Sequence, residues 1–218
     1  MGKDVVIVGG LGSGVIAYET FLAIQEATGE WNVLGMLSDV SPEDIPHVNI
    51  IGTSDKVADY LRDGVSIHYT LHFNAQAKEQ RMRWLDKLAI PNELNATAIH
   101  PDSKLDRNTT VFPGSLINRG VMSSPGAIIG KNSHVYAGAF IGHDSEIGRG
   151  CTIAAHAVIG GRVAIHQGAH IGLNSTIRED ITISDYAILG AASMLTKDIP
   201  SRQIWAGNPA RFLKIVGE

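Results

Sequence analysis

The chain has 218 residues, of which 44% are hydrophobic, and its formal net charge is -4 at pH 7. This composition is typical of a globular protein with one or two domains, and the absence of a long basic run excludes a nucleic-acid footprint. Cys151 is the one cysteine, and no apolar run reaches the roughly 18 residues of a membrane span. We therefore expect a cytoplasmic protein, without membrane insertion, whose partners are small molecules or copies of itself.

Strands and helices are predicted to alternate over the first hundred residues. Apolar runs with the pattern of buried strands lie at 4–10, 33–39 and 66–73. Segments with helical apolar spacing lie at 15–27, 56–63 and 75–90. Because such alternation produces a parallel sheet with crossover helices, residues 1–98 are expected to form a Rossmann-like α/β domain.

A glycine-rich turn, GGLGSG at 9–14, follows the first predicted strand and opens the first predicted helix. The backbone N–H groups of such a turn can hold phosphates, although an ordinary tight turn has the same sequence pattern. About ninety residues leave little room for the second half of a dinucleotide domain. A single nucleotide diphosphate is therefore the better match.

A six-residue repeat begins at Ile99 and ends at Leu195. Sixteen of its seventeen positions are aliphatic, and Ser123 is the exception. Small residues such as Ser133 and Cys151 follow four positions later. Three hexapeptides form one triangular coil whose interior these side chains fill, so residues 99–198 are predicted to be a parallel β-helix and the Cys151 thiol to be packed inside it.

The repeat ends before the tail at 199–218. An open coil end exposes unpaired backbone groups, so the tail is the predicted cap. Within it, ARFLKIV at 210–216 is predicted to form a short amphipathic helix.

The period of 18 residues places the side chains of successive coils in columns. Gly161 follows His143 in one column, and a glycine there permits a close approach to the histidine. Asp144 shares a column with Arg162 and Asp180, which also fits a surface charge ladder worth about 0 to 1 kcal/mol. His143 and Asp144 are the candidate catalytic pair.

A third column is mostly apolar. A soluble monomer rarely exposes such a stripe, so it is predicted to be a subunit interface. Its members are Met122, Phe140, Val158, Thr176 and Met194.

His134 and His170 are 36 residues apart. This is the first interval of the three-histidine zinc sites in the gamma-class carbonic anhydrases, but Ser175 stands at the third ligand position. We expect no metal, and we interpret the two residues as polar surface histidines.

The α/β domain, IHPDS at 99–103, IGHDSEIG at 141–148 and GNPAR at 207–211 together resemble the bacterial nucleotide-sugar acetyltransferases. That family includes UDP-4-amino-sugar N-acetyltransferases and sialic-acid O-acetyltransferases. The resemblance implies a left-handed β-helix, a homotrimer, and acetyl-CoA bound between neighbouring helices. It implies acetyl transfer to the C4 amine of a nucleotide-linked amino sugar.

The resemblance also implies roles for individual residues. His143 corresponds to the general base, and Asp144 to the acidic neighbour that raises its basicity. The implied acetyl-CoA contacts are Thr152, Gly161, Leu173 and Ala191, with the Gly161 amide on the thioester carbonyl. The implied nucleotide contacts are Gly12, Ser13, Gly14, Ser38 and Asp39. The chain departs from the family in having Thr152 where histidine is often found, and Ser13 and Val15 in place of histidine and lysine.

An imidazole with a pKa near 6.5 suits a general base at neutral pH. No serine or cysteine is placed as a paired nucleophile, so direct attack without an acyl-enzyme is expected. O-acetylation of the sialic-acid type stays open, because no residue separates an amine from a hydroxyl acceptor. More distant alternatives are a metal-dependent hydratase and a non-catalytic nucleotide-binding scaffold.

Overall fold

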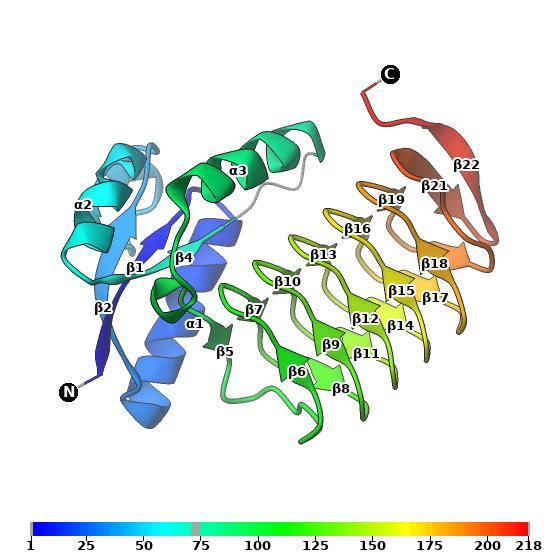
Figure 1. Ribbon diagram of the computed structural model, residues 1–218, viewed down its shortest axis with the longest axis horizontal. Helices are drawn as coiled ribbons and strands as arrows, with labels where there is room; N and C mark the ends of the chain where they lie inside the picture. The colour runs from blue at the N-terminus through cyan, green and yellow to red at the C-terminus, as the bar shows by residue number, and fades with distance from the viewer. Residues whose placement is uncertain (1, 71–74, 218) are drawn as a thin grey trace.

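The computed structural model describes residues 2–70 and 75–217. An N-terminal α/β unit is followed by a column of stacked coils and a C-terminal hairpin, so that β1 and β22 lie at opposite ends of the molecule (Figure 1). No helix of these residues is long and apolar enough to cross a membrane.

The α/β unit is built on a four-stranded parallel sheet of order β3-β2-β1-β4. Its strands are β1 (Lys3–Val8), β2 (Trp31–Leu37), β3 (Ile50–Gly52) and β4 (Ser66–Tyr69). Its helices are α1 (Ser13–Thr28), α2 (Val57–Arg62) and α3 (Ala75–Leu88), with short 3-10 turns at η1 (Pro42–Asp44), η2 (Ser54–Lys56) and η3 (Asn92–Leu94). The predicted alternation is confirmed, except that the end of the predicted strand 66–73 lies outside the described residues.

Strand β1 is central and buried on both faces. Val5 and Ile7 pack with α1, whereas Val6 and Val8 pack with α2 and α3. This two-sided burial explains its unbroken aliphatic run. Strand β3 was not predicted, because three residues are too few to show a period.

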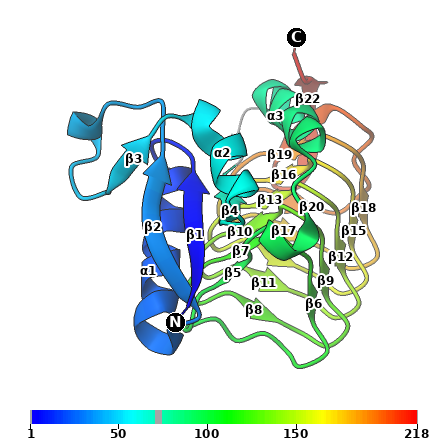
Figure 2. The ribbon, with the colours of Figure 1, turned by 60° about the vertical axis from the view of Figure 1, so that its left-hand side comes forward.

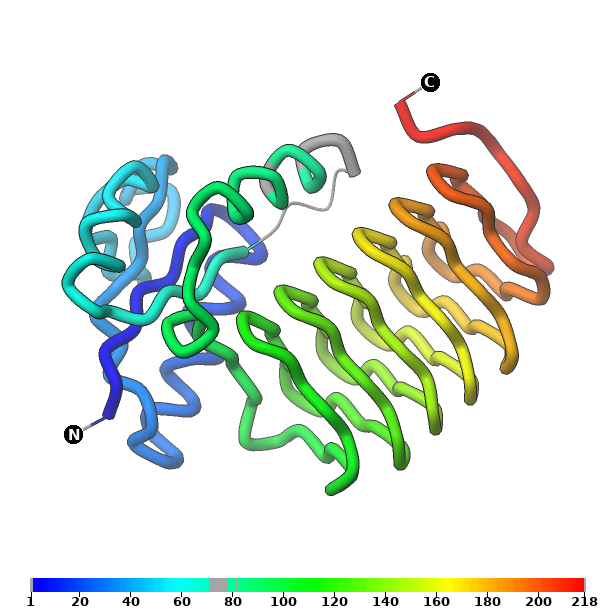
Figure 3. Tube along the Cα trace, viewed as in Figure 1, coloured from blue at the N-terminus to red at the C-terminus, as the bar shows by residue number. Residues whose placement is uncertain are grey.

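The coils form a left-handed parallel β-helix with three walls, whose successive turns stack along one axis in Figures 2 and 3. The first wall contains β5 (Ala98–Ile99), β7 (Leu116–Ile117), β10 (His134–Val135), β13 (Thr152–Ile153), β16 (His170–Ile171) and β19 (Ile188–Leu189). The second contains β8 (Met122–Ser123), β11 (Phe140–Ile141), β14 (Val158–Ile159), β17 (Thr176–Ile177) and β20 (Met194–Leu195). The third contains β6 (Thr110–Val111), β9 (Ile128–Ile129), β12 (Glu146–Ile147), β15 (Ala164–Ile165) and β18 (Thr182–Ile183).

The predicted columns are confirmed by the strand register. Phe140 pairs with Met122 on one side and with Val158 on the other, each 18 residues away. Interior positions such as Ile141 and Ile159 are 0% exposed, and each such side chain contributes roughly 1.5 to 3 kcal/mol of burial. Cys151 is 1% exposed, as predicted for a packed thiol.

The two ends of the β-helix depart from the repeat. Ile99 is 41% exposed, because no earlier coil covers it. At the other end, the helix predicted at 210–216 is wrong. The tail forms β21 (Gln203–Gly207), which pairs with β19, and β22 (Ala210–Ile215), which pairs antiparallel with β21. Seven residues cannot separate the helix period from a strand, and the free edge of β21 offers backbone partners.

Candidate functional site

His143 and Asp144 lie in the corner turn that follows β11. Nδ1 of His143 is 2.9 Å from Oδ2 of Asp144, and half or more of each side chain is exposed. Asp144 has a left-handed backbone with φ 55°, and its carboxylate lies over Gly126, where a Cβ atom would collide with it. A carboxylate only accepts hydrogen bonds, so the neutral ring carries its proton on Nδ1 and a lone pair on Nε2.

Gly161 lies one coil beyond His143, as the column predicts. A Cβ atom at Gly161 would collide with Nε2 of the ring in its present position, so the glycine permits this close approach. The backbone hydrogen bonds of the described residues include Gly160 N–H and Arg162 N–H as donors, but not Gly161 N–H. A basic nitrogen therefore lies next to a residue whose amide is not used in the backbone hydrogen bonds of the described residues, and acyl transfer requires a base and a donor of these kinds.

Arg162 completes this corner. Of the predicted charge ladder of Asp144, Arg162 and Asp180, the structure shows the pair of Arg162 with Asp180, in which Nε and Nη2 donate to the two carboxylate oxygens at 2.7 and 2.8 Å. Its Nη1 lies 3.4 Å from Nε2 of His143. The guanidinium holds the pKa of Asp180 below its usual value, and the carboxylate raises the pKa of Arg162.

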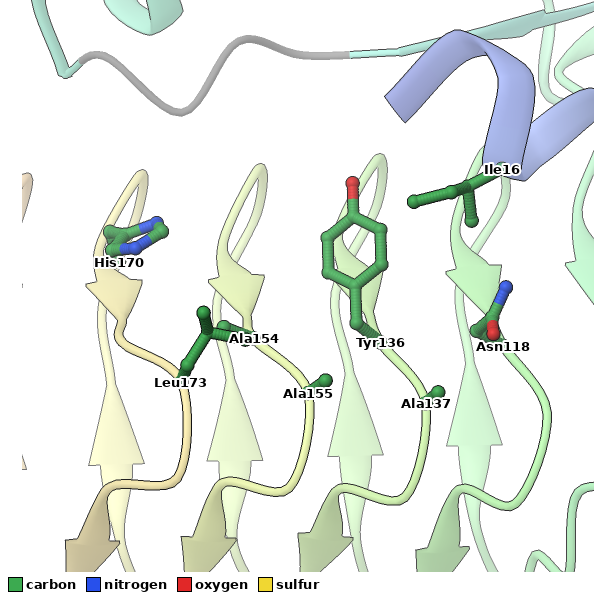
Figure 4. Close-up of a pocket in the computed structure, with 8 residues that line it drawn as sticks. All are labelled: Ile16, Asn118, Tyr136, Ala137, Ala154, Ala155, His170 and Leu173. Carbon is green, nitrogen blue, oxygen red and sulfur yellow. The ribbon is translucent and has the colours of Figure 1, made fainter. Parts of the chain in front are cut away.

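Leu173 and Ala191 lie at a different corner, between the first and second walls, away from His143. Leu173 is 57% exposed and lines an apolar cavity of about 450 Å³, which we call the corner cavity. Figure 4 shows its lining residues, Ile16, Asn118, Tyr136, Ala137, Ala154, Ala155, His170 and Leu173. One chain therefore does not bring all the predicted acetyl-CoA contacts together.

Thr152 offers no open surface. It is 2% exposed, because α3 lies over the first wall and places Nζ of Lys78 2.8 Å from the Thr152 hydroxyl. The same ammonium lies 3.4 and 3.3 Å from the carbonyl oxygens of Gly168 and Ala169. Burial lowers the pKa of Lys78 to about 8.

The interpretation of His134 and His170 as surface histidines is wrong. His134 is 1% exposed and stacks on His68 of β4, with ring centroids 5.6 Å apart. His170 is mostly buried and lines the corner cavity. Burial lowers the pKa of His170 to about 4 and that of His134 well below its usual value. The outer face of the first wall is covered by the α/β unit, which the repeat pattern cannot reveal.

No three histidine, cysteine, aspartate or glutamate side chains are grouped as metal ligands within residues 2–70 and 75–217.

A second cavity, of about 230 Å³, lies where the strands of the α/β unit end, and we call it the strand-end cavity. Its lining includes Ser13 and Asp39 of the predicted nucleotide contacts. Gly12 has φ 71° at the start of α1, and Gly14 packs so closely on Gly9 that a side chain would not fit easily. Ser38 is 3% exposed and accepts a hydrogen bond from Val40 N–H instead of facing the cavity.

Helix α1 connects the two cavities. Its N-terminus has no acidic residue in the first turn and no side-chain cap, so its free N–H groups and dipole favour an anion. Ser13 lines the strand-end cavity and Ile16 lines the corner cavity. Ser13 and Ile16 are about 4.5 Å apart along the helix axis, so both cavities border the first turn of α1.

Comparison with known proteins agrees with this architecture. Residues 126–161 match the family model described as bacterial transferase hexapeptide, six repeats. No curated protein matches the sequence.

Solved structures match the hexapeptide coils and the α/β unit together. A mutant of perosamine N-acetyltransferase from Caulobacter crescentus, in complex with CoA and GDP-perosamine, is 20% identical over 97% of both chains, with a TM-score of 0.81. The acetyltransferase domain of PglB from Neisseria gonorrhoeae FA1090, with acetyl coenzyme A, is 22% identical over 98% of this chain and 100% of that chain, at 0.80. WeeI from Acinetobacter baumannii AYE is 20% identical over 97% and 100%, at 0.76. The chain shares the fold of these proteins over nearly its whole length.

Proposed function

We propose that this protein is an acetyl-CoA-dependent N-acetyltransferase that acts on the C4 amine of a nucleotide-linked amino sugar. The observation that carries the proposal is the His143–Asp144 pair, whose Nε2 lies against Gly161, a residue whose amide makes no backbone hydrogen bond among the described residues. The fold shared with the perosamine and PglB acetyltransferases supports it.

In the proposed reaction the amine nitrogen attacks the thioester carbonyl carbon while Nε2 of His143 takes the amine proton. Asp144 stabilises the imidazolium, and the Gly161 amide donates to the oxyanion. Collapse of the intermediate breaks the C–S bond, and His143 returns the proton to the sulfur of CoA. No acyl-enzyme is needed, because Cys151 is sealed in the interior and burial raises its pKa to about 11.

The nucleotide sugar is proposed to lie along α1. The nucleotide occupies the strand-end cavity, its phosphates lie at the N-terminus of α1 near Ser13, and the sugar extends past Ile16 towards the corner cavity. Residues 1–98 then hold the acceptor, residues 99–198 carry out the transfer, and residues 199–218 close the coils.

The proposed active unit is a homotrimer with acetyl-CoA between neighbouring β-helices. His143 lies at the corner between the second and third walls, whereas Leu173 lies at the corner between the first and second. The outer face of the second wall carries the apolar column, with Met122 46% and Val158 41% exposed. Packing of this wall against a neighbour would bring Leu173 of one subunit towards His143 of the next.

The test incubates the protein with acetyl-CoA and a panel of UDP-, dTDP- and GDP-linked 4-amino sugars and measures free CoA. Release of CoA with one of these acceptors, and an N-acetyl product by mass spectrometry, supports the proposal. Activity on free sialic acid alone would replace it with O-acetylation. If neither class of acceptor causes CoA release, and the protein contains stoichiometric zinc that is lost in His170→Ala, the metal-dependent hydratase is indicated. If neither class causes CoA release but the protein binds a nucleotide, the non-catalytic scaffold is indicated.

A further inference from the structure

The Arg162 guanidinium lies beside the basic nitrogen of His143. Nη1 of Arg162 is 3.4 Å from Nε2, while Nδ1 faces the Asp144 carboxylate at 2.9 Å. An arginine N–H only donates, and a carboxylate only accepts. Both neighbours therefore match a single neutral tautomer, in which Nδ1 carries the proton and Nε2 carries the lone pair.

Asp180 fixes the guanidinium in this place. The two hydrogen bonds of 2.7 and 2.8 Å form a bidentate pair, which sets the orientation of the guanidinium plane. The backbone continues the arrangement, since Arg162 N–H donates to His143 O at 2.8 Å and Asp180 N–H donates to Gly161 O at 3.1 Å. Base, cation and anion thus stand on three successive coils.

The pair contributes little to folding. The side chains of Arg162 and Asp180 are 50% and 59% exposed, and ion pairs at such sites are screened by water. Stabilisation of the fold therefore does not explain why the arginine is directed at Nε2. Orientation of the His143 ring does explain it.

We propose that Arg162 is a positioning residue for His143, which holds the ring in the tautomer that can accept a proton at Nε2 until the acceptor amine replaces it there. The inference rests on the proposed function. Once Nε2 has taken the amine proton, its N–H faces a like charge held by Asp180. This repulsion favours passage of the proton to the sulfur as the C–S bond breaks.

The experiment compares Arg162→Gln with Arg178→Gln in full-length protein labelled with ring-15N histidine. Arg178 is an exposed cation of the neighbouring coil, so its variant loses the same charge without the contact to His143. The His143 signals are assigned by their loss in His143→Ala. In Arg162→Gln we expect the Nε2 resonance of His143 to move towards the protonated position and kcat to fall about 10-fold, with KM for acetyl-CoA unchanged within about 2-fold. A lysine at this position can donate a hydrogen bond to Nε2 and, unlike glutamine, cannot accept one. Arg162→Lys should therefore have a higher kcat than Arg162→Gln.

Two results would overturn the inference. In the first, the His143 tautomer and kcat of Arg162→Gln both equal those of Arg178→Gln. In the second, the tautomer shifts but kcat stays within about 2-fold of the wild type, which leaves Arg162 without a part in turnover. The nuclear magnetic resonance measurement needs no substrate. An absence of acetyl transfer in the wild-type protein would therefore refute the proposed function while the contact is judged separately.

Discussion

The histidines between the two units should make the protein sensitive to mild acid. His68 of β4 is 0% exposed and lies between Phe21 and His134, with ring centroids 5.1 and 5.6 Å away. Its Nδ1 is 2.8 Å from Ala96 O, and Nε2 has no hydrogen-bond partner among the described residues. Burial lowers the pKa of His68 to about 4.

The sign follows from the depressed pKa. Above pH 6.5 the histidine is neutral in the folded and the unfolded chain, so its contribution to stability is complete. As the pH falls from 6.5 towards 4, the unfolded chain takes up a proton that the folded protein refuses, and stability is lost. Each pH unit in this window costs about 1.4 kcal/mol, so His68 alone should cost about 2.5 kcal/mol between pH 7 and pH 4.5.

The assay is urea unfolding at pH 7 and pH 4.5, at fixed protein concentration and ionic strength, followed by circular dichroism. The loss of unfolding free energy between the two pH values should be about 2.5 kcal/mol smaller in His68→Phe than in the wild type. His47→Phe removes an exposed histidine and should match the wild type. An equal loss in all three proteins would refute the reasoning, because the buried ring would then titrate as in the unfolded chain.

Three further predictions concern the base, the interface and the coil interior. His143→Ala should lower turnover about 100-fold while acetyl-CoA still binds by calorimetry, and unchanged turnover would remove His143 from the mechanism. Phe140→Glu should break the trimer in light scattering, and a wild-type mass near that of the 23.3 kDa chain would contradict the interface itself. Ile147→Ala should cost about 2 to 5 kcal/mol in unfolding free energy, because Ile147 is 0% exposed inside the coils, whereas Glu146→Ala changes an exposed side chain on the same strand, outside the proposed interface, and should cost far less. Equal costs would mean that the inward and outward positions are misassigned.

The β-helix was predictable because one geometric rule fixes it. A period of six sets the interior positions and a period of 18 sets the columns, so Ile141, Cys151 and the approach of Gly161 to His143 all follow from counting. The hexapeptide period predicts nothing beyond the first and last coils. Ile99 has no coil before it, and the segment after Leu195 pairs as strands although its short apolar pattern also fits a helix.

The outer surface was less predictable, because the repeat does not say what covers it. His134 and Thr152 point outward from the first wall, where the pattern favours solvent exposure, but Lys78 and His68 of the α/β unit bury them. The contact between Arg162 and His143 was missed for a different reason. The column places the two residues one coil apart, but only the side-chain conformation set by Asp180 turns the guanidinium towards Nε2.

The proposed catalytic residues lie at an exposed corner of the coils, where polar side chains do not disturb the packing of the interior. The interior positions are restricted to aliphatic and small residues, whereas the side chains of His143 and Asp144 are half or more exposed and are not part of the packed interior. What the corner does require is space, and two glycines provide it, since side chains at Gly126 and Gly161 would collide with Asp144 and His143. In a hexapeptide repeat, a polar corner with a glycine one coil before it and another one coil after it is therefore better evidence for a catalytic site than a histidine alone. His156 illustrates the difference: it occupies a corner with a left-handed backbone and is itself packed over Gly138, but no acidic partner orients its ring among the described residues.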